Sequence, residues 1–281
     1  MNWNKGKKSL LRSMSAELGN MLGSPWFYLA VAGLVALFLS AEYYTDSFGR
    51  SYSIGGLLFT GQKPDREFPF SYLLSAGAAG GMFRCFASLC ISLPFVMRVS
   101  AERTSGYIRF ANYYAGTGKY VLVKGLAGLL CGGFLAVAGF LCYIVVLLSG
   151  VSIHGLDSLP DGAGTAALCL RLALGMFFYG AFAIGWIYPF AGWIKDKYVL
   201  LCIPFLCRYL YLQILFQVSL RMVEMQEIAG LERISKMYPD SIIFSSGQNM
   251  DWPGLGLRGL LVLAAAALWL LMMKRRRDLG E

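Results

Sequence analysis

The sequence predicts an all-α integral membrane protein with six transmembrane helices. Two observations carry the prediction: long apolar stretches recur along the chain, and basic residues gather in alternate loops between them. The chain has 281 residues, 57% of them hydrophobic, which predicts a single transmembrane domain over residues 1–281 without room for a soluble catalytic domain. The predicted spans are Trp26–Ala41, Ala76–Val99, Tyr120–Ser149, Ala163–Pro189, Tyr198–Leu220 and Gly254–Met273.

Most of these stretches are long enough to cross a bilayer, because a spanning helix needs about 20 apolar residues. The first stretch is shorter. We expect it to continue through Glu42–Tyr44, with the tyrosines at the lipid surface.

The distribution of charge predicts the orientation of the chain. Most of the 25 Lys and Arg residues lie in the two ends of the chain and in two of the loops, whereas the other three loops are mainly acidic. The positive-inside rule then places both termini in the cytoplasm of a multi-pass protein in a bacterial-type cell membrane. The net charge of +9 therefore reflects orientation, and no stripe of exposed Lys and Arg supports nucleic-acid binding. The basic residues on the predicted cytoplasmic side are Lys5, Lys7, Lys8, Arg12, Arg98, Arg103, Arg109, Lys119, Lys124, Lys195, Lys197, Lys274, Arg275, Arg276 and Arg277.

Several kinds of chemistry are not expected in this chain. All seven cysteines fall within predicted spans, where buried free cysteine behaves as a small apolar residue. A single histidine, His154, cannot build a zinc site or a histidine-based catalytic site, and we expect no metal. No G-x-x-x-x-G-K-[ST] loop is present, so we expect no ATP hydrolysis by this chain and no enzymatic activity. Energy must come from a partner or from an ion gradient.

Two amphipathic segments flank the spans. Residues 8–22 place their apolar side chains on one helical face, which predicts a helix in the cytoplasmic interface, ended by Ser24-Pro25. Residues 221–252 lie between spans five and six, and Ile228, Leu231, Ile234 and Met237 recur there every three residues. We predict an external amphipathic helix, which either rests on the bundle or acts as an external gate.

Small residues recur within two of the spans. Ser75–Gly81 and Gly128–Gly132 carry glycines that allow helix backbones to approach closely in lipid, and we assign both to helix packing. The polar loop Tyr43–Ser75 suggests no chemistry.

The cytoplasmic loop after the second span holds the most informative motif. Residues 100–119 contain Glu102-Arg103-Thr104-Ser105-Gly106, then a short mixed segment and the glycines Gly116 and Gly118. Lys119 and Lys124 lead into the third span. This arrangement resembles the coupling loop of ABC type-2 export permeases, although Tyr107 stands where that family favours Thr or Ser.

The resemblance extends to the interfacial helix, the six spans and the external helical segment. It implies the transmembrane subunit of an ATP-driven ABC exporter, which works with separate ATPase subunits and a second permease copy or homologue. It also implies a short cytoplasmic coupling helix after Gly106, with no cofactor in this chain because ATP and Mg²⁺ sit on the partner. By this resemblance the residues that couple to the ATPase are Glu102, Arg103, Gly106, Tyr107, Ile108, Phe110, Tyr113 and Tyr114.

Individual roles follow from chemistry. Glu102 would orient the turn or pair with cations on the interfacial helix or the ATPase, and Gly106 would let the chain bend. The aromatic side chains would dock on the ATPase, or else form an aromatic belt at the membrane surface.

Arg208 lies near the middle of the fifth span, where facing lipid would be costly, so we expect it to face the bundle interior or a wet cavity. Either it pairs with backbone carbonyls freed by Pro204, or it lines a translocation path with Gln213 and Gln217 and contacts anionic cargo.

Other functions remain open. An ion-coupled secondary transporter is the main alternative, but no Asp or Glu falls within a predicted span. A membrane-embedded hydrolase lacks an evident catalytic set. A non-transport membrane protein without an ATPase partner is a further alternative. The short external loops favour a hydrophobic, peptide or lipid-like substrate over a polysaccharide.

Overall fold

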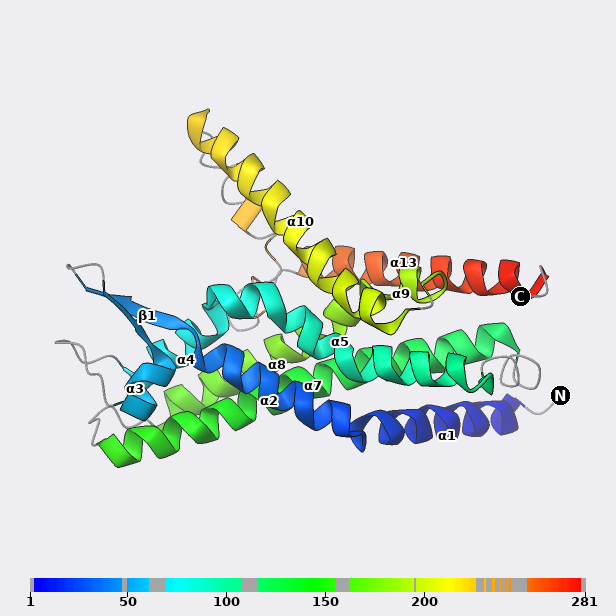
Figure 1. The fold of residues 1–281 in the computed structure, drawn as a ribbon, viewed down its shortest axis with the longest axis horizontal. Coiled ribbons are helices and arrows are strands. Elements are labelled where there is room, and N and C mark those ends of the chain that lie inside the picture. Colours follow the sequence, from blue (N-terminus) through cyan, green and yellow to red (C-terminus); the bar gives the residue numbers. More distant parts are fainter. Residues whose placement is uncertain are drawn as a thin grey trace.

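The computed structural model describes residues 3–46, 50–60, 69–107, 116–154, 162–194, 196–225 and 252–278, and positions 230, 234, 235, 238, 241 and 243. These residues form an elongated bundle of helices with one small hairpin (Figure 1). The elements are α1 (Trp3–Leu22), α2 (Pro25–Leu39), β1 (Glu42–Thr45), β2 (Ser51–Ser53), α3 (Ile54–Thr60), α4 (Phe70–Ala79), α5 (Gly81–Thr104), α7 (Thr117–His154), α8 (Gly162–Gly185), α9 (Tyr188–Ala191), α10 (Lys197–Glu224) and α13 (Trp252–Asp278).

Within the described residues, four helical segments are long and apolar enough to cross a membrane. They are Gly81–Thr104, Thr117–Gly150, Gly164–Ala191 and Lys197–Val223. A fifth becomes possible if the bent pair α1–α2 counts as one span. These helices indicate a membrane-embedded protein. The sixth predicted stretch, Gly254–Met273, lies wholly inside α13, but α13 is not one of the four segments that are long and apolar enough to cross a membrane.

The chain turns sharply between α1 and α2. The Ser24 hydroxyl accepts a hydrogen bond from the Phe27 backbone N–H, and Pro25 occupies the first turn of α2, where its missing N–H costs nothing. The two helices diverge by 59° at this point. The predicted boundary at Ser24-Pro25 is therefore confirmed, and the first helix is longer than the predicted 8–22.

The predicted continuation of the first span through Glu42–Tyr44 is wrong. The helix ends at Leu39, and these residues instead form β1, which pairs antiparallel with β2. The Tyr72 hydroxyl of α4 donates a hydrogen bond to the Tyr43 carbonyl at 3.0 Å, so the hairpin is anchored to the helix that follows it. Aromatic and hydroxyl side chains suit a short strand pair better than a helix in lipid.

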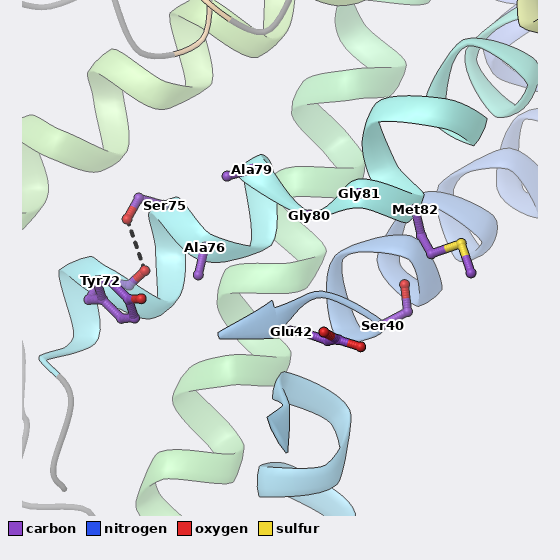
Figure 2. Close-up of a pocket in the computed structure, with 9 residues that line it drawn as sticks. All are labelled: Ser40, Glu42, Tyr72, Ser75, Ala76, Ala79, Gly80, Gly81 and Met82. Carbon is purple, nitrogen blue, oxygen red and sulfur yellow. Dashed lines mark hydrogen bonds between the residues drawn. The ribbon is translucent and has the colours of Figure 1, made fainter. Parts of the chain in front are cut away.

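The second predicted span is also interrupted. Its first residues belong to α4, and the chain breaks at Gly80 before α5 begins (Figure 2). A Cβ atom on Gly80 would lie 2.7 Å from Ala41 Cβ, so only glycine allows the break to sit against the end of α2. An open pocket of about 740 Å³ lies beside this break, lined among others by Glu42, Ser75 and Gly81.

The fourth and fifth spans differ in detail from the prediction. The fourth, predicted over Ala163–Pro189, corresponds to the segment Gly164–Ala191, which contains a turn after Gly185 between α8 and the short helix α9. Residues 221–224, predicted to be external, complete α10. In the rest of the predicted external helix, Gly230, Ile234 and Ser235 are described and helical, and Ile234 is buried, whereas Ile228, Leu231 and Met237 lie outside the described residues.

Glycines bring α7 and α8 into close contact, as predicted for the small residues of the third span. A Cβ on Gly132 of α7 would lie 2.6 Å from the carbonyl oxygen of Gly180 on α8. A Cβ on Gly128 of α7 would lie 2.7 Å from the ring of Phe95, which belongs to α5. The large contact between α7 and α8 therefore depends on backbones that nearly touch.

The start of α1, the end of α13 and the junction between α5 and α7 lie at one end of the bundle, and the hairpin lies at the other (Figure 1). The helix α10 diverges from the bundle along its length. The sites described below lie at the first end and beside α10.

Candidate functional site

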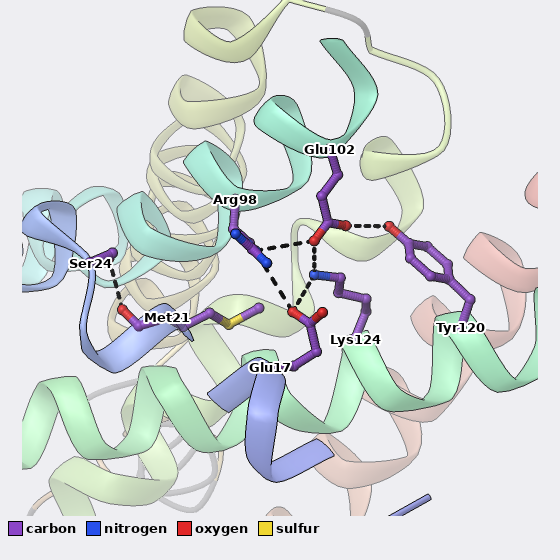
Figure 3. Close-up of polar contacts among 7 residues, drawn as sticks. All are labelled: Glu17, Met21, Ser24, Arg98, Glu102, Tyr120 and Lys124. Atoms are coloured by element: carbon purple, nitrogen blue, oxygen red, sulfur yellow. Dashed lines mark hydrogen bonds and ion pairs between the residues drawn. The ribbon is translucent and has the colours of Figure 1, made fainter. Parts of the chain in front are cut away.

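Four charged side chains meet where α1, α5 and α7 come together (Figure 3). Glu17 comes from α1, Arg98 and Glu102 from α5, and Lys124 from α7. Glu102 is 4% exposed and Lys124 only 1%, so the ions at the centre of the cluster are removed from solvent. We refer to these four residues together with Tyr120 as the charge cluster.

Lys124 joins the two carboxylates. Its Nζ donates to Glu17 Oε2 at 2.5 Å and also to Glu102 Oε1. Arg98 Nε lies 3.1 Å from Glu102 Oε1 and 3.8 Å from Glu17 Oε2. The Tyr120 hydroxyl donates to the second oxygen of Glu102 at 2.9 Å. Glu102 therefore receives contacts on both of its oxygens, from residues on two helices.

Helical spacing explains why the sequence can build this cluster. Arg98 and Glu102 are four residues apart on α5, and Tyr120 and Lys124 are four apart on α7, so each pair shares a helix face. Glu17 sits on the last turns of α1, which packs against α5 and α7.

The cluster balances two carboxylates against two cations. Removing ions from water is expensive, and close pairing offsets that cost only while every partner is present. Loss of one member therefore leaves a buried charge uncompensated. This makes the cluster a fixed joint between the three helices.

The predicted coupling loop starts directly after the joint. α5 ends at Thr104, and Gly106 adopts φ +71°, a left-handed conformation that suits glycine. Arg103 donates from Nη1 to the carbonyl of Ile194, which ties this turn to the segment between α9 and α10. The bend predicted at Gly106 is confirmed.

Tyr107 is the one aromatic residue of the predicted coupling loop that lies among the described residues. Tyr107 is 47% exposed beside the turn. Ile108, Phe110, Tyr113 and Tyr114, and with them the predicted coupling helix, lie outside the described residues. At the far side of the loop Gly116 has φ +81°, and α7 begins at the next residue. Gly118, which was grouped with the turn, is already inside α7.

The sequence offered two roles for Glu102. It was expected to orient the turn, or to pair with cations on the interfacial helix or on the ATPase. Within the described residues its cationic partners are Arg98 on its own helix and Lys124 on α7, and α1 contributes a carboxylate, Glu17. Sequence reasoning gave Glu17 and Tyr120 no role. The available signal was the presence of Glu102 and Lys124 beside long apolar runs, since such charges need partners.

A second site lies farther along the bundle. Arg208, 5% exposed, lines a cavity between α5, α8, α10 and α13, and its guanidinium lies 4.7 Å from the centre of the Tyr179 ring. The expectation that Arg208 faces the interior or a cavity is confirmed. Gln213 and Gln217 are exposed on α10 and do not line this cavity, so the structure does not bring the three predicted path residues together.

The described residues contain no group of three or more His, Cys, Asp or Glu side chains that could hold a metal ion. No protein-family model matches the chain, and no curated protein matches it.

Proposed function

We propose that the chain is the transmembrane subunit of an ATP-driven ABC exporter. The single observation that carries this proposal is the charge cluster at the root of the loop that follows α5. The loop begins with Glu102-Arg103-Thr104-Ser105-Gly106, the stretch that resembles the coupling loop of ABC type-2 permeases. Its glutamate joins α5 directly to α7 and, through Lys124, to Glu17 of α1.

The loop is joined to a stiff part of the bundle. A chain that does not hydrolyse ATP must take its motion from a partner, and a force applied to a loose loop would be lost in the loop. Glu102 lies within the last turn of α5, so a displacement of the loop is passed to α5 and, through Lys124, to α7 and α1. The partner would then move three helices as one unit, and the exposed Tyr107 is available for contact with it.

The proposed assembly contains two permease chains and two ATPase subunits, with six spans in each permease and both termini in the cytoplasm. The end of the bundle that holds the charge cluster is the cytoplasmic end in this assembly. ATP and Mg²⁺ belong to the ATPase subunits, and the cargo is hydrophobic, a peptide or lipid-like.

The test is coupling in a purified complex. The tagged chain is isolated from the cells that make it naturally and reconstituted with the ATP-hydrolysing subunit that accompanies it. We expect Glu102→Ala and Tyr113→Ala to lower transport and the stimulation of ATP hydrolysis while leaving the chain in the membrane. The matched control is Tyr28→Ala, which removes an exposed aromatic residue of α2 away from the loop. Wild-type transport and stimulation in both loop variants would remove the loop from the mechanism.

An ion-coupled secondary transporter is the second candidate. One observation favours it: Glu102 is a buried carboxylate within a helix that is long and apolar enough to span. Pairing with both Arg98 and Lys124 argues against it, because a carboxylate that carries protons must be able to lose its cationic partners. Transport driven by a proton or sodium gradient without ATP would establish this alternative.

A further inference from the structure

The cavity beside Arg208 has the size and composition of a ligand site. Its volume is about 420 Å³, within the range of about 300–1,000 Å³ that is usual for small-molecule pockets. Most of its lining is apolar or aromatic and comes from α5, α8, α9, α10 and α13. Four of these helices, α5, α8, α9 and α10, belong to segments that can span a membrane, so we expect the cavity to lie beside the hydrocarbon.

Two arginines contribute positive charge to this apolar space. Arg208 is nearly buried and stacks on Tyr179. Arg258, on α13, donates to the Tyr238 carbonyl at 3.0 Å and to Ser241 Oγ at 3.1 Å, and it also lines the cavity. Arg208 and Arg258 are the only charged side chains among the described lining residues, so this part of the lining has a positive formal charge, which suits an anion.

A hydroxyl group in the same lining is available for a ligand. Ser88 of α5 is 1% exposed and lines the cavity, and among the described residues its Oγ has no hydrogen-bond partner. Buried hydroxyl groups are normally hydrogen-bonded, so an unpaired one in a cavity wall is a reason to expect a polar guest.

The lining of the cavity is partly exposed. Trp186, Leu261 and Leu268 all line it, and these large apolar side chains are between 42% and 56% exposed. An apolar, partly open lining of this kind suits a molecule whose apolar tail extends from the arginines toward the bilayer.

We propose that this cavity binds an amphiphile with an anionic head group, of the kind presented by an anionic phospholipid. The head group contacts Arg208, Arg258 and Ser88, and the apolar part lies against Trp186 and the exposed face of α13. The assignment of such a molecule as cargo rests on the proposed exporter function, whereas its binding does not.

The experiment compares two lipids on the purified full chain in neutral detergent, without ATP or an ATPase. Phosphatidylglycerol and phosphatidylcholine with identical acyl chains are titrated, and bound lipid is measured by native mass spectrometry. Both head groups carry a phosphate, but the choline cation of phosphatidylcholine is repelled by the two arginines, so we expect phosphatidylglycerol to bind roughly 10-fold tighter or more. Arg208→Gln should remove this preference.

The matched control is Arg221→Gln, because Arg221 is an exposed arginine on the same helix and does not line the cavity. It should keep the wild-type preference. A second variant, Ala264→Phe, leaves both arginines in place and fills the cavity from an exposed position on α13, and it should weaken binding of both lipids. If Arg208→Gln does not fold, weaker binding of both lipids by Ala264→Phe still tests whether the cavity is the binding site.

Several results would overturn the proposal. The preference for phosphatidylglycerol could survive Arg208→Gln or be lost equally in Arg221→Gln, or Ala264→Phe could bind both lipids as tightly as the wild type. Glycerol phosphate without acyl chains could bind as tightly as the lipid, which would make the cavity a site for soluble anions. Lipid could bind only after a dimer dissociates, which would make a second copy of the chain the occupant. Because no ATPase is present, none of these results bears on the coupling test above.

Discussion

At the scale of single residues, the almost wholly buried Lys124 is the residue on which the stability of the charge cluster depends most. Its ammonium group contacts carboxylates from two other helices, one of them 107 residues away along the chain. No neighbouring group within the described cluster can replace it, because Arg98 lies 3.8 Å from Glu17 and is itself engaged with Glu102. Lys124 is therefore the residue whose removal should be felt most widely.

We predict that Lys124→Met lowers the free energy of unfolding by about 3–5 kcal/mol, the usual cost of removing one partner from a buried ion pair. The reason is that Glu17 and Glu102 then share one arginine. Thermal unfolding in detergent measures the effect. Lys197→Met is the control, since Lys197 is exposed at the start of α10 and its loss should change stability by about 0.5 kcal/mol or less.

The double variant Glu102→Gln/Lys124→Met sharpens this prediction. It removes one charge of each sign, so it should be less destabilised than the sum of the two single variants. If the two single effects simply add, Lys124 and Glu102 do not act as a pair.

At the scale of helices and strands, α7 and α8 pack so closely that their backbones are in contact at Gly132 and Gly180. Gly132 and Gly180 face each other so closely that neither position has room for a methyl group. In a lipid environment, where apolar side chains gain little by leaving the surroundings, such close van der Waals contact is a main source of helix association.

We predict that Gly132→Ala destabilises the bundle by about 1–3 kcal/mol, the typical cost of overpacking. Its new Cβ would meet the Gly180 carbonyl and the Ile184 side chain. Gly118→Ala, in the same helix, is the control: its Cβ would meet only Leu270 at 3.9 Å, so the change should be neutral or slightly stabilising. Equal unfolding temperatures for the two variants would contradict the close contact.

The helices were largely predictable, whereas the features between them were not. Each long apolar run predicts a helix, because a stretch without charges is stable in lipid and a helix pairs its own backbone hydrogen bonds there. The hairpin of β1 and β2 escaped prediction because strands of four and three residues carry too short a pattern. The break at Gly80 escaped it because glycines within a span also serve helix packing, and only the position of Ala41 distinguishes the two uses.

The candidate site was predictable in part for a similar reason. The local motif led to Glu102 and Gly106, which lie within a few residues of each other. The partner Glu17 could not be found from spacing, since it meets Lys124 only through the packing of α1 on α7. The cavity at Arg208 is lined by residues of five helices, so the sequence predicted a buried arginine without its surroundings.

At the scale of the whole molecule, the two ends of the bundle are chemically different. The start of α1, the end of α5, which carries Glu102, and the end of α13 lie at one end, and the hairpin with α3 and α4 lies at the other (Figure 1). Because the charged loops predict which end faces the cytoplasm, labelling from one side of a membrane can test the orientation of the molecule.

We predict that single cysteines at Ser51 and Gly155, in a background without the seven native cysteines, react with a membrane-impermeant maleimide in intact cells. Cysteines at Ser105, Gly118 and Asp278 should react only after permeabilisation, because they lie at the end that we place in the cytoplasm. Labelling of Gly118 from outside would reverse the orientation and remove the basis for an ATPase contact there.

The contact between Glu17 and Lys124 also constrains how the protein is made. Glu17 leaves the ribosome 107 residues before its partner, which at about 5–20 residues per second is a delay of roughly 5–20 s. During this interval the carboxylate has no Lys124 to neutralise it, and water is the better surrounding for it. We therefore expect the nascent α1 to stay in contact with water until α7 is inserted and Lys124 can pair with Glu17.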